Sequence, residues 1–292
     1  MSLDLVSITT YPRRIVCLTE ETTETLYLLG AGDLVVGVSG YTVRPPEARE
    51  KPKISAFLTA RHDKILELRP DLVLAFSDLQ ADVTAELQRL GLTVFAFNQR
   101  SVQEILQMVA LLARIVGVEA RGVELVRSLS AGLDAIASSA AQFPRRPRVF
   151  FEEWMDPLIS GIRWVEELIE MAGGEPIFPE LRAKQGGKER IVSAAEVAAR
   201  APDVVIGSWC GRKVKKVVIR SREGWASTPA VRDGHIYEVA SAVILQPGPA
   251  ALTEGVRQLH AILAHVAGVD VDPALAPAWP LDRALPRPTD AT

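Results

Sequence analysis

Short apolar runs alternate with amphipathic stretches along the first hundred residues. Four runs predict buried strands, at residues 14–18, 34–38, 72–76 and 93–97. Polar and apolar positions between the runs predict helices at residues 19–29, 63–68 and 81–90. Strands that are apolar on both faces and alternate with helices indicate a parallel sheet covered on both sides.

Two long helices interrupt this pattern, and then it restarts. The helices are predicted at residues 101–116 and 119–142, and Pro144 and Pro147 follow the second. In the second half, strands are predicted at 148–151 and 204–208, and helices at 162–172 and 194–200. The apolar run 240–245 is interpreted as a further strand end. We therefore expect an α/β chain with two lobes and long helices between them.

The two halves share a local plan. Residues 65–77 (ILELRPDLVLAFS) and 197–209 (VAARAPDVVIGSW) both read as helix, Pro-Asp and apolar strand, and their Pro-Asp steps lie 132 residues apart. Because the order of elements repeats as well, an internal duplication is predicted. The alternative is chance, since this connection is common in α/β proteins. The expected domains are an N-terminal lobe (1–100), linking helices (101–146), a C-terminal lobe (147–267) and a Pro-rich tail (268–292).

Composition narrows the function classes. The net charge of −3 argues against a nucleic-acid partner, which favours a positive face. Cys17 and Cys210 fall in different halves, so no disulfide is expected, and the four scattered histidines predict no Cys/His metal site. Neither a signal peptide nor an apolar run of 18 residues is seen, so localisation is not readable from the residues.

The residues that follow the predicted strands are aromatic and polar. In an open parallel sheet, ligands bind outside the carboxyl ends of the strands. The side chains expected there are Glu20, Glu21, Tyr41, Phe76, Asp78, Trp154, Trp209, Cys210 and Gln246. Two lobes that face each other place such residues on the walls of a cleft, and flat side chains suit a large, flat, partly apolar ligand.

Each of these side chains also has a structural interpretation. Trp154 and Trp209 are expected at the cleft, although either could pack within its own lobe. Cys210 can be a bystander thiol, and the Glu20–Glu21 pair can serve helix electrostatics as well as ligand recognition. Arg163 and Trp164 can cover the cleft, or Trp164 can be the first residue on the side of its helix that packs against the core. A group of four cations has two interpretations: it lies in a solvated loop, or it contacts phosphate or propionate groups of the ligand. The four are Arg212, Lys213, Lys215 and Lys216.

No catalytic constellation is predicted. The chain has no Gly-x-Ser-x-Gly, phosphate-binding loop or dinucleotide fingerprint. Glu152 and Glu153 could supply an acid and a base, but neighbours on a strand point to opposite faces. We therefore expect a binding protein rather than an enzyme.

Four segments resemble a known family. They are RIVCLTEETTETLYLLG (14–30), VVGVSGYTVRPPEA (35–48), KILELRPDLVLAF (64–76) and RAPDVVIGSW (200–209). These segments look like the substrate-binding proteins of ABC importers for cobalamin and iron-siderophores, the helical-backbone class of periplasmic binding proteins. The resemblance, over about residues 13–267, implies two Rossmann-like lobes with mostly parallel sheets, joined by a long rigid helix (the class III periplasmic binding protein fold).

The resemblance also implies roles for single residues. Tyr41 matches a corrinoid-contacting tyrosine, and Phe57 and Phe76 stand where cobalamin binders have tryptophans that contact the ligand. Asp63 matches an acidic residue that docks on the permease, and Glu196 is the nearest counterpart in the second lobe, offset by one position. Gln246 begins a loop that replaces an arginine of the cobalamin binders.

These likenesses imply a monomeric substrate-binding component of an ABC importer that delivers a corrinoid, cobalamin, to a membrane permease. The cobalt would belong to the ligand, and no covalent cofactor is expected. The resemblance implies a periplasmic location. Two alternatives stay open: an iron-siderophore or haem ligand on the same fold, and a cytoplasmic corrinoid-binding protein or enzyme that has kept the fold.

Overall fold

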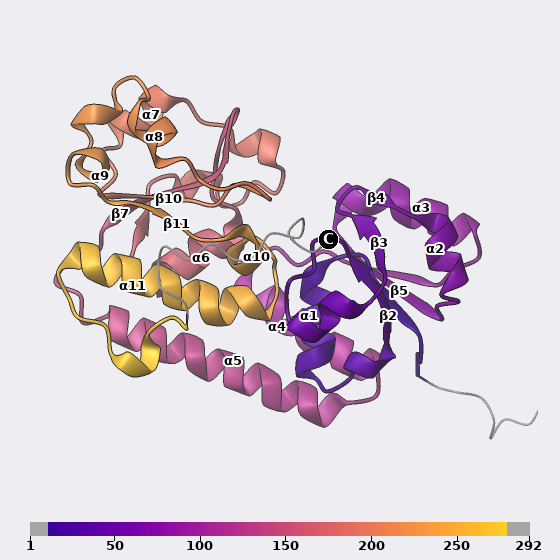
Figure 1. Ribbon diagram of the computed structural model, residues 1–292. Helices are drawn as coiled ribbons and strands as arrows, with labels where there is room; N and C mark the ends of the chain where they lie inside the picture. Colours follow the sequence, from indigo (N-terminus) through magenta and orange to yellow (C-terminus); the bar gives the residue numbers. More distant parts are fainter. Residues whose placement is uncertain (1–10, 279–292) are drawn as a thin grey trace, which may run out of the picture. The chain divides into compact units, whose positions relative to one another are not determined.

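The computed structural model describes residues 11–278, which form two compact units with a sheet in each (Figure 1). The N-terminal lobe comprises residues 11–99 and 106–127, and the C-terminal lobe comprises residues 100–105 and 128–278. Helices α4 (Val102–Ile115) and α5 (Glu119–Ala140) each contribute residues to both lobes. The fold is therefore α/β with two lobes, as the sequence predicts.

The N-terminal lobe is built on a six-stranded sheet in the order β4-β3-β2-β1-β5-β6. Its pairs are parallel except β3 with β4. The strands are β1 (Ile15–Cys17), β2 (Val35–Ser39), β3 (Lys53–Ala56), β4 (Thr59–Ala60), β5 (Leu72–Phe76) and β6 (Val94–Phe97). The helices are α1 (Glu20–Leu28), α2 (His62–Glu67) and α3 (Ala81–Arg89). The chain leaves β1 for β2 on one side and returns to β5 on the other, so β1 lies at the switch point of this sheet.

The C-terminal lobe has a five-stranded sheet in the order β11-β10-β7-β8, with β9 also paired to β7. Only the β7–β8 pair is antiparallel. The strands are β7 (Arg148–Met155), β8 (Leu158–Ser160), β9 (Glu175–Pro176), β10 (Val204–Gly207) and β11 (Ile236–Glu238). The helices are α6 (Arg163–Met171), α7 (Ala194–Ala199), α8 (Lys216–Arg220), α9 (Pro229–Arg232), α10 (Ser241–Ile244) and α11 (Val256–Ala267), the last preceded by a π-helical turn (Ala251–Gly255).

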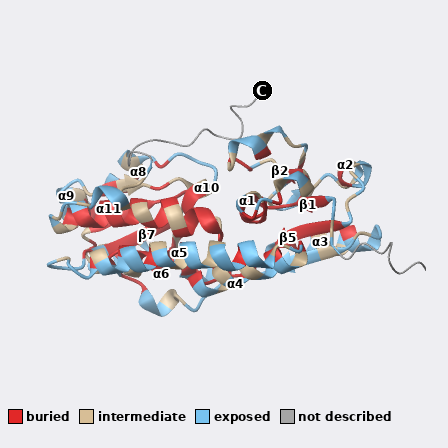
Figure 2. Cartoon of the chain, turned by 90° about the horizontal axis from the view of Figure 1, so that it is seen from below, coloured by how far each residue is buried: buried red, intermediate tan, exposed pale blue. Residues whose placement is uncertain are grey.

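Each lobe has its own apolar core, and Figure 2 shows the strands as mostly buried. In the N-terminal lobe, Val16 of β1 and Val73 of β5 pack with Ile65 of α2 and Leu87 of α3. In the C-terminal lobe the core contains the large rings Phe150, Phe178, Trp209 and Trp225. Strand β1 has only three residues, and all of its side chains are buried.

The two Pro-Asp steps have the same local geometry. Arg69 and Ala201, which precede Pro70 and Pro202, are both non-glycine residues with positive φ, 45° and 44°. Asp71 accepts hydrogen bonds from the backbone N–H groups of Arg13 and Arg14, at 2.7 and 2.9 Å, where β1 begins.

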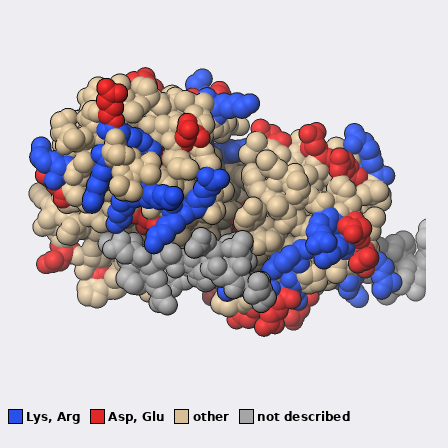
Figure 3. Space-filling view, turned by 45° about the horizontal axis from the view of Figure 1, so that its top comes forward, with Lys and Arg blue, Asp and Glu red and all other residues tan. Residues whose placement is uncertain are grey.

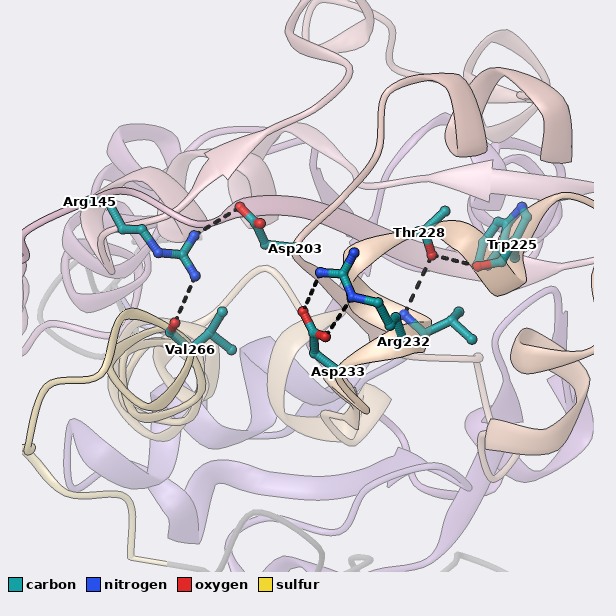
Figure 4. A network of polar contacts seen from close by, with 8 residues as sticks. Arg145, Asp203, Trp225, Thr228, Arg232, Asp233 and Val266 are labelled. Atoms are coloured by element: carbon teal, nitrogen blue, oxygen red, sulfur yellow. Dashed lines mark hydrogen bonds and ion pairs between the residues drawn. The ribbon is translucent and has the colours of Figure 1, made fainter.

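Asp203 has the same role in the C-terminal lobe, where it accepts from the backbone N–H of Arg148 at 2.8 Å at the start of β7. Arg145 also binds Asp203, at 3.1 Å, and donates to the Val266 carbonyl at 2.9 Å (Figure 4). This shared arrangement of turn, carboxylate and strand start supports the predicted internal repeat.

Two sequence-based expectations about elements are wrong. The run 240–245 is not a strand, because α10 occupies Ser241–Ile244, and the strand in this region is the earlier β11. Strand β7 extends to Met155, so Glu152 and Trp154 lie within it rather than after it. After Gly268 the chain forms a short 3-10 turn, and Ala278 N–H donates to Glu254 at 2.9 Å. Residues 279–292 of the predicted tail lie outside the described part.

Candidate functional site

The first turn of α1 is polar and buried. Glu20 is 9% exposed and Glu21 1%, and the threonines before and after them are buried as well. The Thr19 hydroxyl donates to Glu21 Oε1 at 2.5 Å, and the Thr23 and Thr25 hydroxyls donate to backbone carbonyls one turn earlier. A threonine followed by two acidic residues is a sequence pattern typical of a helix start.

Burial changes the protonation of these groups. It raises the pKa of Glu20 to about 8, with a further contribution from the neighbouring Glu21. It raises the pKa of Glu21 to about 7, although the Thr19 hydroxyl opposes the shift. The thiol of Cys17, at the end of β1, is buried too, and its pKa is raised to about 12. Burial therefore favours the neutral forms of the two carboxyl groups in the first turn of α1.

The end of β2 presents an aromatic side chain on a tight turn. Gly40 N–H donates to the Ser55 carbonyl at 2.7 Å, and a Cβ at Gly40 would lie 3.2 Å from that oxygen, so glycine suits the position. Tyr41 N–H donates to Ser39 Oγ at 3.1 Å, and the Tyr41 side chain is 42% exposed. Arg44, further along this loop, forms an ion pair with Glu24 of α1 at 2.9 Å.

Gln80 connects the two phenylalanines that the sequence singles out. Its Oε1 accepts from Phe76 N–H at 3.0 Å, and its Nε2 donates to the Phe57 carbonyl at 2.7 Å. The Phe57 side chain is half-buried, Phe76 is buried, and Asp78 is exposed. Sequence reasoning missed Gln80, although the Ser77 cap three residues earlier was a local signal for an ordered turn.

Glu152 organises the centre of the C-terminal sheet. Its carboxylate is fully buried and accepts from both terminal nitrogens of Arg222, at 2.5 and 2.8 Å, and from Trp209 Nε1 at 2.9 Å. Trp209 is 1% exposed and belongs to the apolar core of its own lobe. The structure therefore favours the packing alternative for Trp209, which differs from the expected ligand-facing position.

The other predicted side chains of this lobe divide between core and surface. Trp164 is buried, and its Nε1 donates to the Ile244 carbonyl at 2.9 Å, so it is a core residue. Arg163 is exposed and pairs with Glu167 at 2.8 Å. Trp154 is half-buried and Arg212 lies 5.3 Å above its ring, while Cys210 is exposed. Gln246 follows α10 and is half-buried.

A second buried charge cluster was not predicted. Arg190 is 1% exposed, contacts Glu153 at 2.7 Å and also donates to the Ser160 carbonyl. Glu166 lies in the same region, and burial raises its pKa to about 8 against the opposing influence of Arg182 and Arg190. No sequence signal joins Glu153 to Arg190, because 37 residues separate them.

The two candidate docking residues occupy equivalent helices. Asp63 is exposed in the first turn of α2, eight residues before Asp71. Glu196 is exposed in the first turn of α7, seven residues before Asp203. Glu196 accepts from Ser193 N–H at 2.8 Å and from its hydroxyl at 2.7 Å, and these bonds hold the pKa of Glu196 below its usual range.

Charge and metal-binding potential are unremarkable elsewhere. Figure 3 shows basic side chains over both lobes, with acidic ones beside them on the N-terminal lobe. Within residues 11–278, no group of three or more His, Cys, Asp or Glu side chains is placed to hold a metal ion. In the same range, no helix is both long and apolar enough to cross a bilayer.

Comparison with known proteins gives consistent matches over most of the chain. The family model described as periplasmic binding protein matches residues 15–243. An uncharacterized ABC transporter substrate-binding lipoprotein, YvrC of Bacillus subtilis, is 28% identical over 263 residues, covering 87% of this chain and 81% of the relative. A vitamin B12-binding protein of Vibrio parahaemolyticus is 25% identical over 246 residues, covering 82% and 85%.

A solved structure agrees with the fold. The periplasmic heme-binding protein RhuT of Roseiflexus sp. RS-1, in its apo form, superposes with a TM-score of 0.75 at 24% identity, over 87% of this chain and 99% of that one. The arrangement of two lobes with mostly parallel sheets is thus that of the class III fold named above. The relatives are named as binding proteins, not as enzymes.

Proposed function

Because the chain belongs to the periplasmic binding protein family, we propose that it is the substrate-binding component of an ABC importer. Its partners would be a small-molecule ligand and a membrane permease. The relative from Bacillus subtilis, named as an ABC transporter substrate-binding lipoprotein, supports this role and a location outside the cytoplasmic membrane.

The ligand we propose is a corrinoid, cobalamin. The observation that carries this proposal is the similarity to the vitamin B12-binding protein of Vibrio parahaemolyticus over 82% of the chain. Two strand ends of the N-terminal lobe support it, since the exposed Tyr41 ring follows β2 and the polar first turn of α1 follows β1. Such surfaces suit a large ligand with an apolar face and neutral polar groups.

Calorimetric titration with cyanocobalamin tests the proposal. We expect saturable heat with one site per chain and a red protein after gel filtration. Tyr41→Ala should weaken binding about tenfold through the loss of ring contact, and Tyr41→Phe should retain most of the affinity. If neither heat nor co-elution is seen at tens of micromolar ligand, cobalamin is not the ligand.

An anionic iron ligand is the second candidate. The loop after β10 carries Arg212 above the Trp154 ring, with Lys213 and Lys215 exposed nearby in the sequence, and such cations suit haem propionates or a ferric siderophore. Parallel titrations with haemin and with ferric siderophores separate this candidate from cobalamin. Tighter binding of either iron ligand than of cyanocobalamin would favour it.

A further inference from the structure

The Glu21 carboxyl is buried with half of its hydrogen-bonding capacity unused. Its Oε1 accepts from the Thr19 hydroxyl at 2.5 Å, and the side chain is 1% exposed. Its Oε2 is buried and has no hydrogen-bond partner among residues 11–278. Buried polar atoms without partners are rare in native proteins, so this oxygen requires an explanation.

The carboxyl follows a strand at the edge of the sheet where open α/β folds bind ligands. Glu21 lies in the first turn of α1, directly after β1, and β1 is the switch-point strand of its sheet. Thr42, which follows the neighbouring parallel strand β2, is 2% exposed, and its hydroxyl also has no partner within the described chain. Two unsatisfied buried groups therefore follow two adjacent strands at the edge where α/β sheets bind ligands.

Burial favours the neutral form of Glu21, and no cation is paired with it in the described residues. The group behind it on β1 is the buried Cys17 thiol, and its neighbour is Glu20, whose carboxyl is buried as well. Arg44, from the loop after β2, pairs with Glu24 one turn later, and within the described residues no Lys or Arg forms an ion pair with Glu21. A neutral carboxyl keeps one O–H donor, and with Oε1 held by Thr19 that donor belongs to Oε2.

We propose that the neutral Glu21 carboxyl donates a hydrogen bond from Oε2 to a carboxamide oxygen of the ligand. The Thr42 hydroxyl can then meet the amide of the same or an adjacent group. The neutral carboxyl thus offers a donor to the amide rim of a corrinoid, whereas the ionised form would offer only acceptors. This inference rests on the proposed function, since its probe is a corrinoid.

The test is the pH dependence of cyanocobalamin binding, measured by calorimetry between pH 6 and pH 9. Burial raises the pKa of Glu21 to about 7, so the donor is lost over this range. If only the protonated form binds, the affinity falls about 100-fold from pH 6 to pH 9. Binding at pH 8 then takes up about one proton per ligand, which titrations in buffers of different ionisation enthalpy measure.

Glu21→Gln is the decisive variant, because its amide keeps an N–H donor and does not titrate. We expect it to bind within a few-fold of wild type at pH 6 and to keep that affinity at pH 9. Glu166→Gln is the matched control, since Glu166 is also buried, with a raised pKa and a partnerless Oε2, but lies on α6 of the other lobe. It should retain the wild-type pH profile.

The outcomes separate this inference from the proposed function. Corrinoid binding that is independent of pH and takes up no proton overturns the role of Glu21 and leaves the function standing. The same follows if Glu166→Gln abolishes the pH dependence as Glu21→Gln does. Absence of binding in every protein at every pH overturns the corrinoid ligand, and this inference with it. The wild-type profile and the proton uptake decide the question even if Glu21→Gln does not fold.

Discussion

Glu21 and Glu152 are both almost fully buried, yet their surroundings differ. Glu152 receives the two terminal nitrogens of Arg222 and the indole N–H of Trp209, which stabilise a buried negative charge. Glu21 has no cation and one hydroxyl donor, so the neutral acid is favoured. The same residue type therefore stabilises the core in one lobe and provides a titrating group in the other.

Glu21 should make the stability of the protein depend on pH. Its pKa is about 7 in the folded chain and about 4.5 in the unfolded chain, so the unfolded state loses its proton first. The free energy of unfolding therefore falls as pH rises through this window and stays low above it. Glu21→Gln should reduce the loss between pH 5 and pH 8 by about 2 kcal/mol, measured by urea unfolding. An unchanged loss would show that Glu21 is not held neutral.

Arg222 should be far more important for stability than its exposed neighbour Arg220. Arg222→Ala leaves the buried Glu152 carboxylate without a cation and should cost about 3 kcal/mol of unfolding free energy. Arg220→Ala changes a solvated side chain and should stay within about 0.5 kcal/mol. Denaturant unfolding of the two variants provides the comparison, and equal effects would contradict the assigned role of Glu152.

These residue roles were only partly predictable. Glu20 and Glu21 stood out because two acids follow a short strand, and the structure places them there. Glu152 was read as the residue after a strand because a carboxylate in a core is unfavourable on its own. Its partner Arg222 lies 70 residues later, so a local sequence pattern cannot predict the ion pair that stabilises the buried carboxylate. Trp209 was misplaced for the same reason, since its hydrogen-bond acceptor is Glu152.

Element prediction succeeded where apolar runs were long enough to stand out. Strand β5 was predicted residue for residue, and helices α3 and α4 within one residue at each end. Strand β11 was missed because Ile236–Glu238 is only three residues long and contains a carboxylate. Its place in the sheet comes from parallel pairing with β10, which is tertiary information.

The Pro-Asp turns should carry stability through their aspartates. Asp71→Ala removes the acceptor of two backbone N–H groups, and Asp203→Ala removes the acceptor of one N–H group and of Arg145. Each should cost about 1–3 kcal/mol in denaturant unfolding. Asp233 is the control, because its carboxylate binds only the adjacent, exposed Arg232 in Figure 4, and Asp233→Ala should cost less than about 0.5 kcal/mol. A large effect of Asp233→Ala would undermine the comparison.

At the scale of the whole molecule, the repeated helix, turn and strand give each lobe one exposed acid in a matching place. If these acids dock on the permease as the resemblance implies, Asp63→Lys and Glu196→Lys, made together, should abolish ligand uptake by cells, while calorimetry shows unchanged affinity. Glu67→Lys, at the exposed end of α2, should leave uptake near the wild-type level. Normal uptake by the double variant would exclude these acids from docking.

The contrast between the two cysteines has a practical consequence. Cys17 is fully buried in the N-terminal lobe, which raises the pKa of its thiol to about 12, whereas Cys210 is exposed in the loop that follows β10. Since thiolates are what react with maleimides, the natural chain accepts a dye at one position without engineering. The fluorescence of that dye should change when a ligand or a protein partner binds at this loop, and no mutation is needed to place the dye.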